Sequence, residues 1–424
     1  MKKINLRKIA PVCGAVFAVV ILAVVIVRVF VLQPWKWVRV SAKDLMGGKT
    51  VDVNVSKPDD ETLNKVDGFA MKLFSACYDG KNMMVSPISV FAALGMTANG
   101  AANETLEAME KTLGMTADEA KNYMAALTDS LKDDKQMALA NSIWFSDSAE
   151  FTVNEDFLNE NRGYYKASVF KAPFNARTLK DVNNWVYKNT DGKIDKILED
   201  ISGEDVMFLI NALSFDAKWE VKYEKDKTRE DDFTKEDGSK VRADYMISEE
   251  KIYLETEKAT GFIKPYKDGK YGFLALLPNE GVTVSDLVAS LNGSTYKTMI
   301  DNRINDSVDV RIPKFESEYE SNMNSVLESL GMGIAFDLTR ADFSRMGKSS
   351  SLGFTHIDEV IHKTYISVDE NGTKAKAVTL VRMKCASAIA GHEVYLNRPF
   401  IYMIIDMETG VPYFTGVMMD EAAN

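Results

Sequence analysis

Residues 366–404, ISVDENGTKAKAVTLVRMKCASAIAGHEVYLNRPFIYMI, decide the fold. The stretch begins and ends with strand-like runs of apolar residues, whereas its middle is rich in small residues and lysines. Successive side chains of a strand point to opposite faces. If residues 373–380 form a strand, one face therefore carries only small side chains, namely Thr373, Ala375, Ala377 and Thr379.

A strand face of small side chains has little reason to stay packed. Burial stabilises by roughly 25 cal/mol per Å² of apolar area, and this face has little such area. The same face could enter a gap whose walls are already filled, because nothing large obstructs it. The pattern therefore predicts a strand that inserts after folding. A polar surface loop is the alternative that this segment alone leaves open.

The rest of the chain indicates a large mixed α+β domain. It has 424 residues, of which 46% are hydrophobic and 27% charged, an ordinary globular composition. Residues 63–78 have apolar positions at helical spacing, and the pattern of residues 178–192 predicts an amphipathic helix. Residues 206–219, VMFLINALSFDAKW, form an apolar run typical of a strand buried on both faces.

Several classes of function are disfavoured by composition and motifs. The formal net charge of −11 and the lack of a basic block argue against a nucleic-acid partner. Three widely spaced cysteines (Cys13, Cys77 and Cys385) and three histidines indicate neither a disulfide framework nor a metal site. No nucleophile elbow, phosphate-binding loop or zinc-protease motif occurs, so we expect no enzyme, no cofactor and no metal.

The N-terminus reads as a membrane anchor. Residues 1–8 are a basic flank, and 9–32 are predominantly apolar. The uncharged run 9–27 would extend about 28 Å as a helix, enough to cross a bilayer. Residues 33–62 are largely polar and read as an extracytoplasmic tether. The basic flank predicts that the body lies outside the cytoplasm. A cleaved secretion signal is the alternative.

Six blocks in order resemble the serpin family over about residues 60–420. The blocks are 82–101 (NMMVSPISVFAALGMTANGA), 170–194, 210–223 (INALSFDAKWEVKY), 309–344, 360–373 (VIHKTYISVDENGT) and 394–404 (VYLNRPFIYMI). The resemblance implies the serpin fold, with three β-sheets and about nine helices, in a domain spanning residues 63–424. It also implies an exposed reactive-centre loop at about 370–393.

The resemblance implies a mechanism that matches the inserting strand. A serine protease attacks the loop and forms an acyl-enzyme. The cut loop then inserts into the main sheet and carries the protease to the far pole before deacylation. About fifteen inserted residues at ~3.3 Å each correspond to a displacement near 50 Å. Loop insertion of this kind is a well-known conformational switch of serpins, driven by metastability stored in the native fold.

Site residues follow from the resemblance position by position. The hinge is Glu370, Gly372 and Thr373, followed by the small inserting residues Ala375, Ala377 and Thr379. A polar cluster where the sheet opens comprises Ser86, Ser89, Asn211 and His362. Trp219 and Lys314 mark the top of the sheet, where insertion begins, and Lys314 could pair with Glu370.

The reactive bond is expected at Ala386–Ser387, counted from the hinge glutamate. Counting back from the distal flank moves it about two residues further, so Cys385 and Ala388 are alternatives. These small residues suit elastase-like or subtilisin-like proteases. Lys384 or Arg382 would instead suit trypsin-like proteases.

The sequence thus predicts a monomeric, membrane-tethered inhibitor of extracellular serine proteases. The competing hypothesis is a non-inhibitory serpin that serves as a binding module or carrier. The small side chains on the inserting face favour the inhibitor, because non-inhibitory members tend to carry bulky, charged or proline residues there.

Overall fold

The structure is a computed structural model. It describes residues 38–47, 51–147, 151–203, 207–224, 228–349, 356–373 and 391–420. Within these ranges no helix has the length and apolarity needed to cross a membrane. The predicted span at 9–32 lies outside the described residues, as do the inserting residues Ala375, Ala377 and Thr379 and the whole expected cut region.

The largest sheet has eight strands and forms the centre of the molecule. In spatial order they are β1 (Lys43–Asp44), β5 (Ser168–Ala172), β3 (Met137–Ser146), β6 (Met207–Phe215), β16 (Glu359–Asp369), β17 (Gly372–Thr373) and β7 (Ala217–Lys218), with β14 (Phe315–Asn322) on β16. All nine residues of β6 are buried, as its apolar run predicts for a strand covered on both faces.

Two further sheets and a small ribbon complete the strands. The second sheet runs β10 (Tyr253–Glu255), β11 (Ala259–Pro265), β12 (Tyr271–Pro278), β19 (Phe400–Asp406), β20 (Pro412–Met418), β2 (Met83–Val85). The third runs β18 (His392–Tyr395), β13 (Val308–Pro313), β9 (Lys240–Glu250), β8 (Arg229–Thr234). The ribbon pairs β15 (Gly347–Ser349) with β4 (Phe151–Val153).

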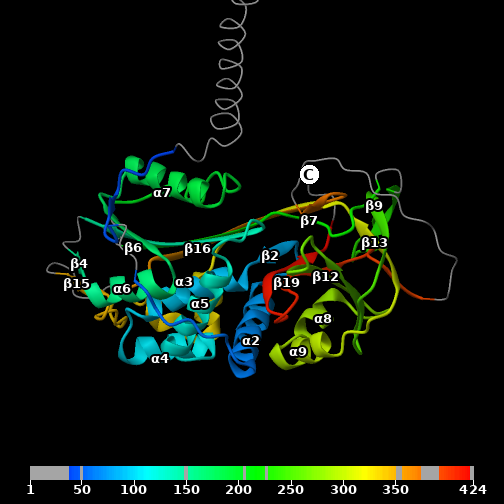
Figure 1. Ribbon diagram of the computed structural model, residues 1–424, viewed down its shortest axis with the longest axis horizontal. Coiled ribbons are helices and arrows are strands. Elements are labelled where there is room, and N and C mark those ends of the chain that lie inside the picture. The colour runs from blue at the N-terminus through cyan, green and yellow to red at the C-terminus, as the bar shows by residue number, and fades with distance from the viewer. Residues whose placement is uncertain are drawn as a thin grey trace, which may run out of the picture.

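Helices cover both faces of the main sheet. The helices of the described residues are α2 (Asp60–Cys77), α3 (Pro87–Ala98), α4 (Asn103–Leu113), α5 (Ala117–Ser130), α6 (Glu155–Tyr164), α7 (Ala176–Asn189), α8 (Val284–Ser290), α9 (Gly293–Asp301) and α10 (Asn324–Leu327). Of these, α8 and α9 contact strands of the second sheet. Two short turns follow α10, η4 (Glu328–Met332) and η5 (Gly333–Phe336). Helix α7 lies alone on one face, while α3, α5 and α6 lie on the other (Figure 1).

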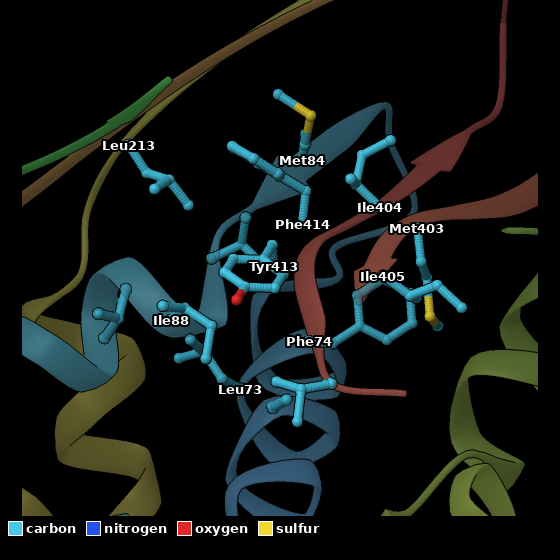
Figure 2. Close-up of a cluster of buried hydrophobic side chains, with 14 of the residues drawn as sticks. Leu73, Phe74, Met84, Ile88, Leu213, Met403, Ile404, Ile405, Tyr413 and Phe414 are labelled. Carbon is cyan, nitrogen blue, oxygen red and sulfur yellow. The ribbon is translucent and has the colours of Figure 1, made fainter. Parts of the chain in front are cut away.

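The main core lies between α2, α3 and the second sheet. Figure 2 shows Leu73 and Phe74 of α2 close to Ile88 of α3 and Tyr413 of β20. Helix α3 is buried along its whole length, because apolar and small residues occupy every face. The Ser86 hydroxyl caps its first turn by accepting from the Ser89 N–H, and Pro87 follows at the first helical position.

A second, smaller core lies under α7. Trp144 of β3 stacks on Phe170 of β5 with ring centroids 4.2 Å apart. Trp185 of α7 meets Phe170 edge-on at 6.4 Å. The amphipathic pattern of α7 places Val182 and Val186 on this core as well.

The described chain confirms the expected fold class. It contains three large sheets and nine α-helices within the described ranges, in the α+β arrangement that the resemblance implies.

Part of the segment predicted as a free tether is built into the body. Lys43 and Asp44 pair with β5 at the edge of the main sheet. The Ser41 hydroxyl donates to Asp181 of α7 at 2.6 Å, and Met46 is buried. The composition of residues 33–62 gives no sign of these contacts, because they are made mainly by the backbone of two charged residues and by a serine hydroxyl.

Candidate functional site at the opening of the main sheet

The main sheet is open between its two central strands. Strands β6 and β16 run parallel and pair only at three positions, from Glu359–Phe208 to Ile361–Ile210. Beyond Ile361, β16 keeps its ladder with β14 on the other side for the rest of its length. In the described residues, no strand pairs with β16 between Ile361 and Val368 on the side that faces β6.

The upper end of this opening is closed by the hinge. Gly372 and Thr373 form β17, which pairs antiparallel with β16 on one side and with β7 on the other. A narrow pocket directly below is lined by Met84, Phe215, Tyr365, Ile366, Thr373, Ile404 and Phe414. The loop expected at 370–393 therefore starts and ends inside sheets, because Gly372–Thr373 and His392–Tyr395 are strands.

Gly372 is required by the close approach of the hinge to β7. Its φ is +153°, which L-residues rarely adopt, and a Cβ there would lie 2.1 Å from the Ala217 carbonyl oxygen. Only glycine permits this contact. The hinge role inferred for Gly372 thus has a local structural reason.

Thr373 is the deepest residue of the hinge. Its side chain is 1% exposed, and its hydroxyl lies 2.6 Å from the Tyr266 hydroxyl. Thr373 is therefore docked within the main sheet, paired with β16 on one side and β7 on the other.

Trp219 holds the hinge from the β7 side. Its backbone N–H donates to the Asn371 carbonyl at 3.0 Å, and its indole Nε1–H donates to the Asp369 carbonyl at 2.8 Å. The Tyr223 N–H donates to the Glu370 carbonyl at 3.1 Å. Three consecutive carbonyls of the hinge thus accept from one short segment.

We expect Trp219→Phe to loosen the docked hinge. The substitution keeps most of the ring but removes the indole donor, which leaves the Asp369 carbonyl without that bond at a cost of about 1 to 2 kcal/mol. Thermal unfolding and hydrogen exchange at Gly372 and Thr373 would measure the effect. Trp185→Phe on α7 is the matched control, and equal hinge protection in both variants would contradict the expectation.

Lys314 forms the ion pair expected with Glu370. Its Nζ lies 3.4 Å from Glu370 Oε1 and 2.9 Å from Asp244 Oδ2. Partial burial acts to lower the pKa of Lys314, but the two carboxylates outweigh burial and raise that pKa. The lysine is thus a partly exposed cation that bridges the hinge to β9.

The four polar residues predicted beneath the opening lie together. The Ser86 N–H donates to His362 Nε2 at 3.0 Å. The Ser89 hydroxyl donates to the Asn211 side-chain oxygen, and the Asn211 amide donates to Asn141. The cluster therefore joins α3, β3, β6 and β16 at the level where the parallel pairing ends.

His362 is held neutral by its burial. It is 2% exposed, and desolvation lowers its pKa from 6.5 to about 4. Its Nε2 must be unprotonated to accept from Ser86. Protonation would remove this bond and place a charge beneath the sheet.

Acid should therefore weaken the native state through His362. Above about pH 7 the residue is neutral both folded and unfolded, so it contributes no pH dependence. Between pH 6.5 and 4 the unfolded chain binds a proton that the folded chain does not, which costs up to about 3 kcal/mol. His362→Gln should flatten this limb in urea unfolding at stepped pH. Parallel profiles for the variant and the wild type between pH 4 and 6.5 would exclude this role.

Sequence reasoning missed three members of the site. Asn141 extends the cluster to the Tyr165 carbonyl, Thr364 donates to the Met84 carbonyl, and Tyr266 contacts Thr373. Asn141 and Thr364 occupy inward-facing positions of their strands, which is only a weak indication from sequence that they belong to the site. Nothing in the sequence links Tyr266 to a residue 107 positions away.

The described residues contain no group of three or more His, Cys, Asp or Glu side chains that could hold a metal ion.

Comparison with known proteins identifies the class. The sequence profile of the serpin family, described as serine protease inhibitors, matches residues 64–421. A serpin-like protein of Thermococcus kodakarensis is 28% identical over 371 residues, covering 84% of this chain and 85% of its own length. Serpin B6 of Macaca fascicularis is 29% identical and covers 80% and 93%, respectively.

Solved structures agree with this assignment. The native state of the thermophilic serpin Tengpin is 43% identical, with a TM-score of 0.86 over 90% of this chain and all of that chain. Its latent state gives a TM-score of 0.77 at 42% identity, over 87% of this chain and all of that one. This chain belongs to the serpin family. Serpins are protease inhibitors rather than enzymes, and family membership supports protease inhibition in general.

Proposed function

We propose that the protein is a suicide-substrate inhibitor of serine proteases that traps the acyl-enzyme by inserting its cut loop between β6 and β16. The observation that carries this proposal is the opening itself, whose upper end already holds β17 paired on both sides. An antiparallel strand entering below β17 would find unused backbone partners on both walls.

The register of β17 specifies how the loop would enter. Thr373 pairs with Val368 and Gly372 with Asp369, so each further loop residue moves one position back along β16. If the loop continued β17 in this register, the pairs on the inner face would be Ala375 with Ile366, Ala377 with Thr364, and Thr379 with His362. All three partners are at most 3% exposed. The small side chains would thus enter against the filled core, and the lysines would face outward.

Continued in the same register, an inserted loop would bring Thr379 to the polar cluster. Its hydroxyl would arrive between Asn211 and His362, where the opening ends. Hydroxyl, amide and imidazole groups can exchange hydrogen bonds as β6 and β16 separate, whereas an apolar patch has none to exchange. This supports a role for the polar cluster in allowing the last part of β6 and β16 to separate.

The reactive bond favoured by the sequence is Ala386–Ser387, with Cys385 and Ala388 as neighbouring alternatives. Small residues at the cut fit an elastase-like or subtilisin-like protease. A cut after Lys384 or Arg382 would fit a trypsin-like protease and would shorten the inserted strand. All of these residues lie outside the described ranges.

The test uses the full-length chain in mild detergent with pancreatic elastase. A denaturing gel should show a complex that survives SDS, and the released C-terminal peptide should begin at Ser387. A complex whose peptide begins at Met383 or Cys385 would move the cut to a basic residue and keep the trapping mechanism. Cleavage without any complex would contradict inhibition of this protease class and favour the non-inhibitory reading.

We further propose that the serpin domain lies outside the cytoplasm and is held at the cell membrane by residues 9–32. The support is the basic flank followed by an apolar run of membrane-spanning length. Alkaline extraction of membranes should leave the protein in the pellet. The measured mass of the protein should show that residues 1–32 are still present. A soluble product with a shortened N-terminus would instead indicate secretion after cleavage.

A further inference from the structure

A buried ion pair lies near the docked hinge and has no part in the trapping mechanism described so far. Lys264 Nζ on β11 is 2.5 Å from Glu250 Oε1 on β9, with 2% and 8% of the two side chains exposed. The Ser248 hydroxyl donates to the same carboxylate oxygen at 2.6 Å. Removing two charges from water costs several kcal/mol per ion, so a well-packed apolar pair would stabilise the fold equally well. Overall stability therefore does not explain the pair.

The pair is in contact with the aromatic residues beside the hinge. Lys264 Nζ lies 4.4 Å from the ring centre of Tyr223 and 5.4 Å from that of Trp219, within the range of cation–π attraction. The Ser248 hydroxyl also lies 3.2 Å from the Tyr223 hydroxyl. The ammonium group thus fixes two rings at once, and the carboxylate fixes the ammonium group.

These two aromatic residues carry the hydrogen bonds to the hinge. Trp219 and Tyr223 supply the three donors to the carbonyls of Asp369, Glu370 and Asn371, two through their backbone N–H groups and one through the Trp219 indole. Trp219 also stacks on Tyr266 with ring centroids 4.5 Å apart, and Tyr266 contacts Thr373. A continuous set of contacts therefore connects the buried charges to the residues from which insertion would begin.

We propose that the Lys264–Glu250 pair is a positioning element that keeps the hinge docked and so determines how promptly insertion follows the cut. The part concerning insertion rests on the proposed function, while the part concerning docking does not. With Thr373 already in the sheet, insertion starts from a paired residue. Without the pair, the two rings lose their fixed positions and the hinge leaves the sheet more often. The acyl-enzyme then has more time to hydrolyse.

The test compares three variants of the full-length chain. Lys264→Met with Glu250→Gln removes both charges at similar volume, Lys264→Arg keeps the cation, and Lys264→Met alone leaves the carboxylate unpaired. We expect the double variant to fold with a melting temperature near that of the wild type. Amide exchange at Trp219 and Tyr223 should become about tenfold faster in it, while exchange in β12 stays unchanged.

Protease inhibition by the variants tests the effect on insertion separately from the effect on docking. In the double variant, the rate of loop cleavage should stay near the wild-type value, whereas the number of inhibitor molecules consumed per trapped protease should rise about threefold or more. Lys264→Arg should restore the wild-type ratio. Wild-type exchange at Trp219 and Tyr223 in the double variant would overturn the positioning role, whether or not any protease is trapped.

If the double variant does not fold, Lys264→Met and Lys264→Arg decide the matter by the same exchange measurement. Faster exchange in Lys264→Met than in Lys264→Arg supports the positioning role. Equal exchange in both overturns it. Faster exchange combined with no trapped protease in the wild type would leave the docking role standing and reject the proposed function.

Discussion

Thr373→Arg should convert the protein from an inhibitor into a substrate. Thr373 is 1% exposed and its hydroxyl contacts the Tyr266 hydroxyl at 2.6 Å, so an arginine has neither space nor a partner for its charge. Burying an unpaired guanidinium costs far more free energy than the backbone pairing of one residue would contribute. The hinge would stay outside the sheet, and insertion would lose its starting point. We expect the consumption of inhibitor per trapped protease to rise at least roughly tenfold.

The control for this prediction is Thr373→Ser, which keeps the hydroxyl and the small size. Both variants should be cut by the target protease at similar rates, because the cut lies far along the loop. The yield of SDS-stable complex distinguishes them. Wild-type yield from Thr373→Arg would show that docking of this residue is not needed for trapping.

Asp67→Ala should stabilise the native protein substantially at pH 8. Asp67 lies on α2, is 1% exposed, and neither of its carboxylate oxygens has a hydrogen-bond partner in the described structure. Burial raises its pKa from 3.8 to about 7, with Lys297 opposing and Asp301 reinforcing the shift. The ionised carboxylate is therefore disfavoured in the folded state, by an amount on the order of 4 kcal/mol above pH 7.

The destabilisation caused by Asp67 depends on pH. Because the folded pKa is raised, stability is greatest below about pH 4 and falls as pH rises through 7. The melting temperature of Asp67→Ala should exceed that of the wild type at pH 8, and the difference should shrink toward pH 4. Glu107→Ala, an exposed acid on α4, should change little at either pH. A destabilised Asp67→Ala at pH 8 would refute this explanation of the residue.

Two buried titratable groups, Asp67 and His362, carry opposite pH-dependent costs in the native state. The buried carboxylate weakens the native state at high pH, and the buried imidazole weakens it at low pH. The unfilled edge between β6 and β16 withholds further ladder hydrogen bonds. The two buried groups thus add pH-dependent costs to the native state, and the edge between β6 and β16 leaves backbone pairs unmade in the described residues.

The sequence predicted the parts of this protein that depend on local pattern. The order of six blocks indicated the fold, which the described sheets and helices confirm. The inserting face indicated by the alternation of small and charged residues stays a prediction, because residues 374–390 lie outside the described residues. The residues Ser86, Ser89, Asn211 and His362, taken from the resemblance, do lie together in space.

The parts that the sequence did not predict depend on pairing between distant segments. The docking of Thr373 against Tyr266 joins residues 107 positions apart, and the Lys264–Glu250 pair joins two strands of different sheets. Lys43 and Asp44 look polar and free in sequence, yet they extend the main sheet. Alternation specifies which face a residue occupies, whereas the identity of the neighbouring strand comes only from the assembled topology.

We propose that the space between β6 and β16 accepts the cut loop. The melting temperature of the protein before and after the loop is cut tests this insertion most directly. The cut protein, freed of protease, should unfold at a much higher temperature, because the inserted strand supplies backbone pairs to both walls. Thr373→Arg should lose most of this increase. A cut protein that melts at or below the temperature of the intact one would contradict loop insertion.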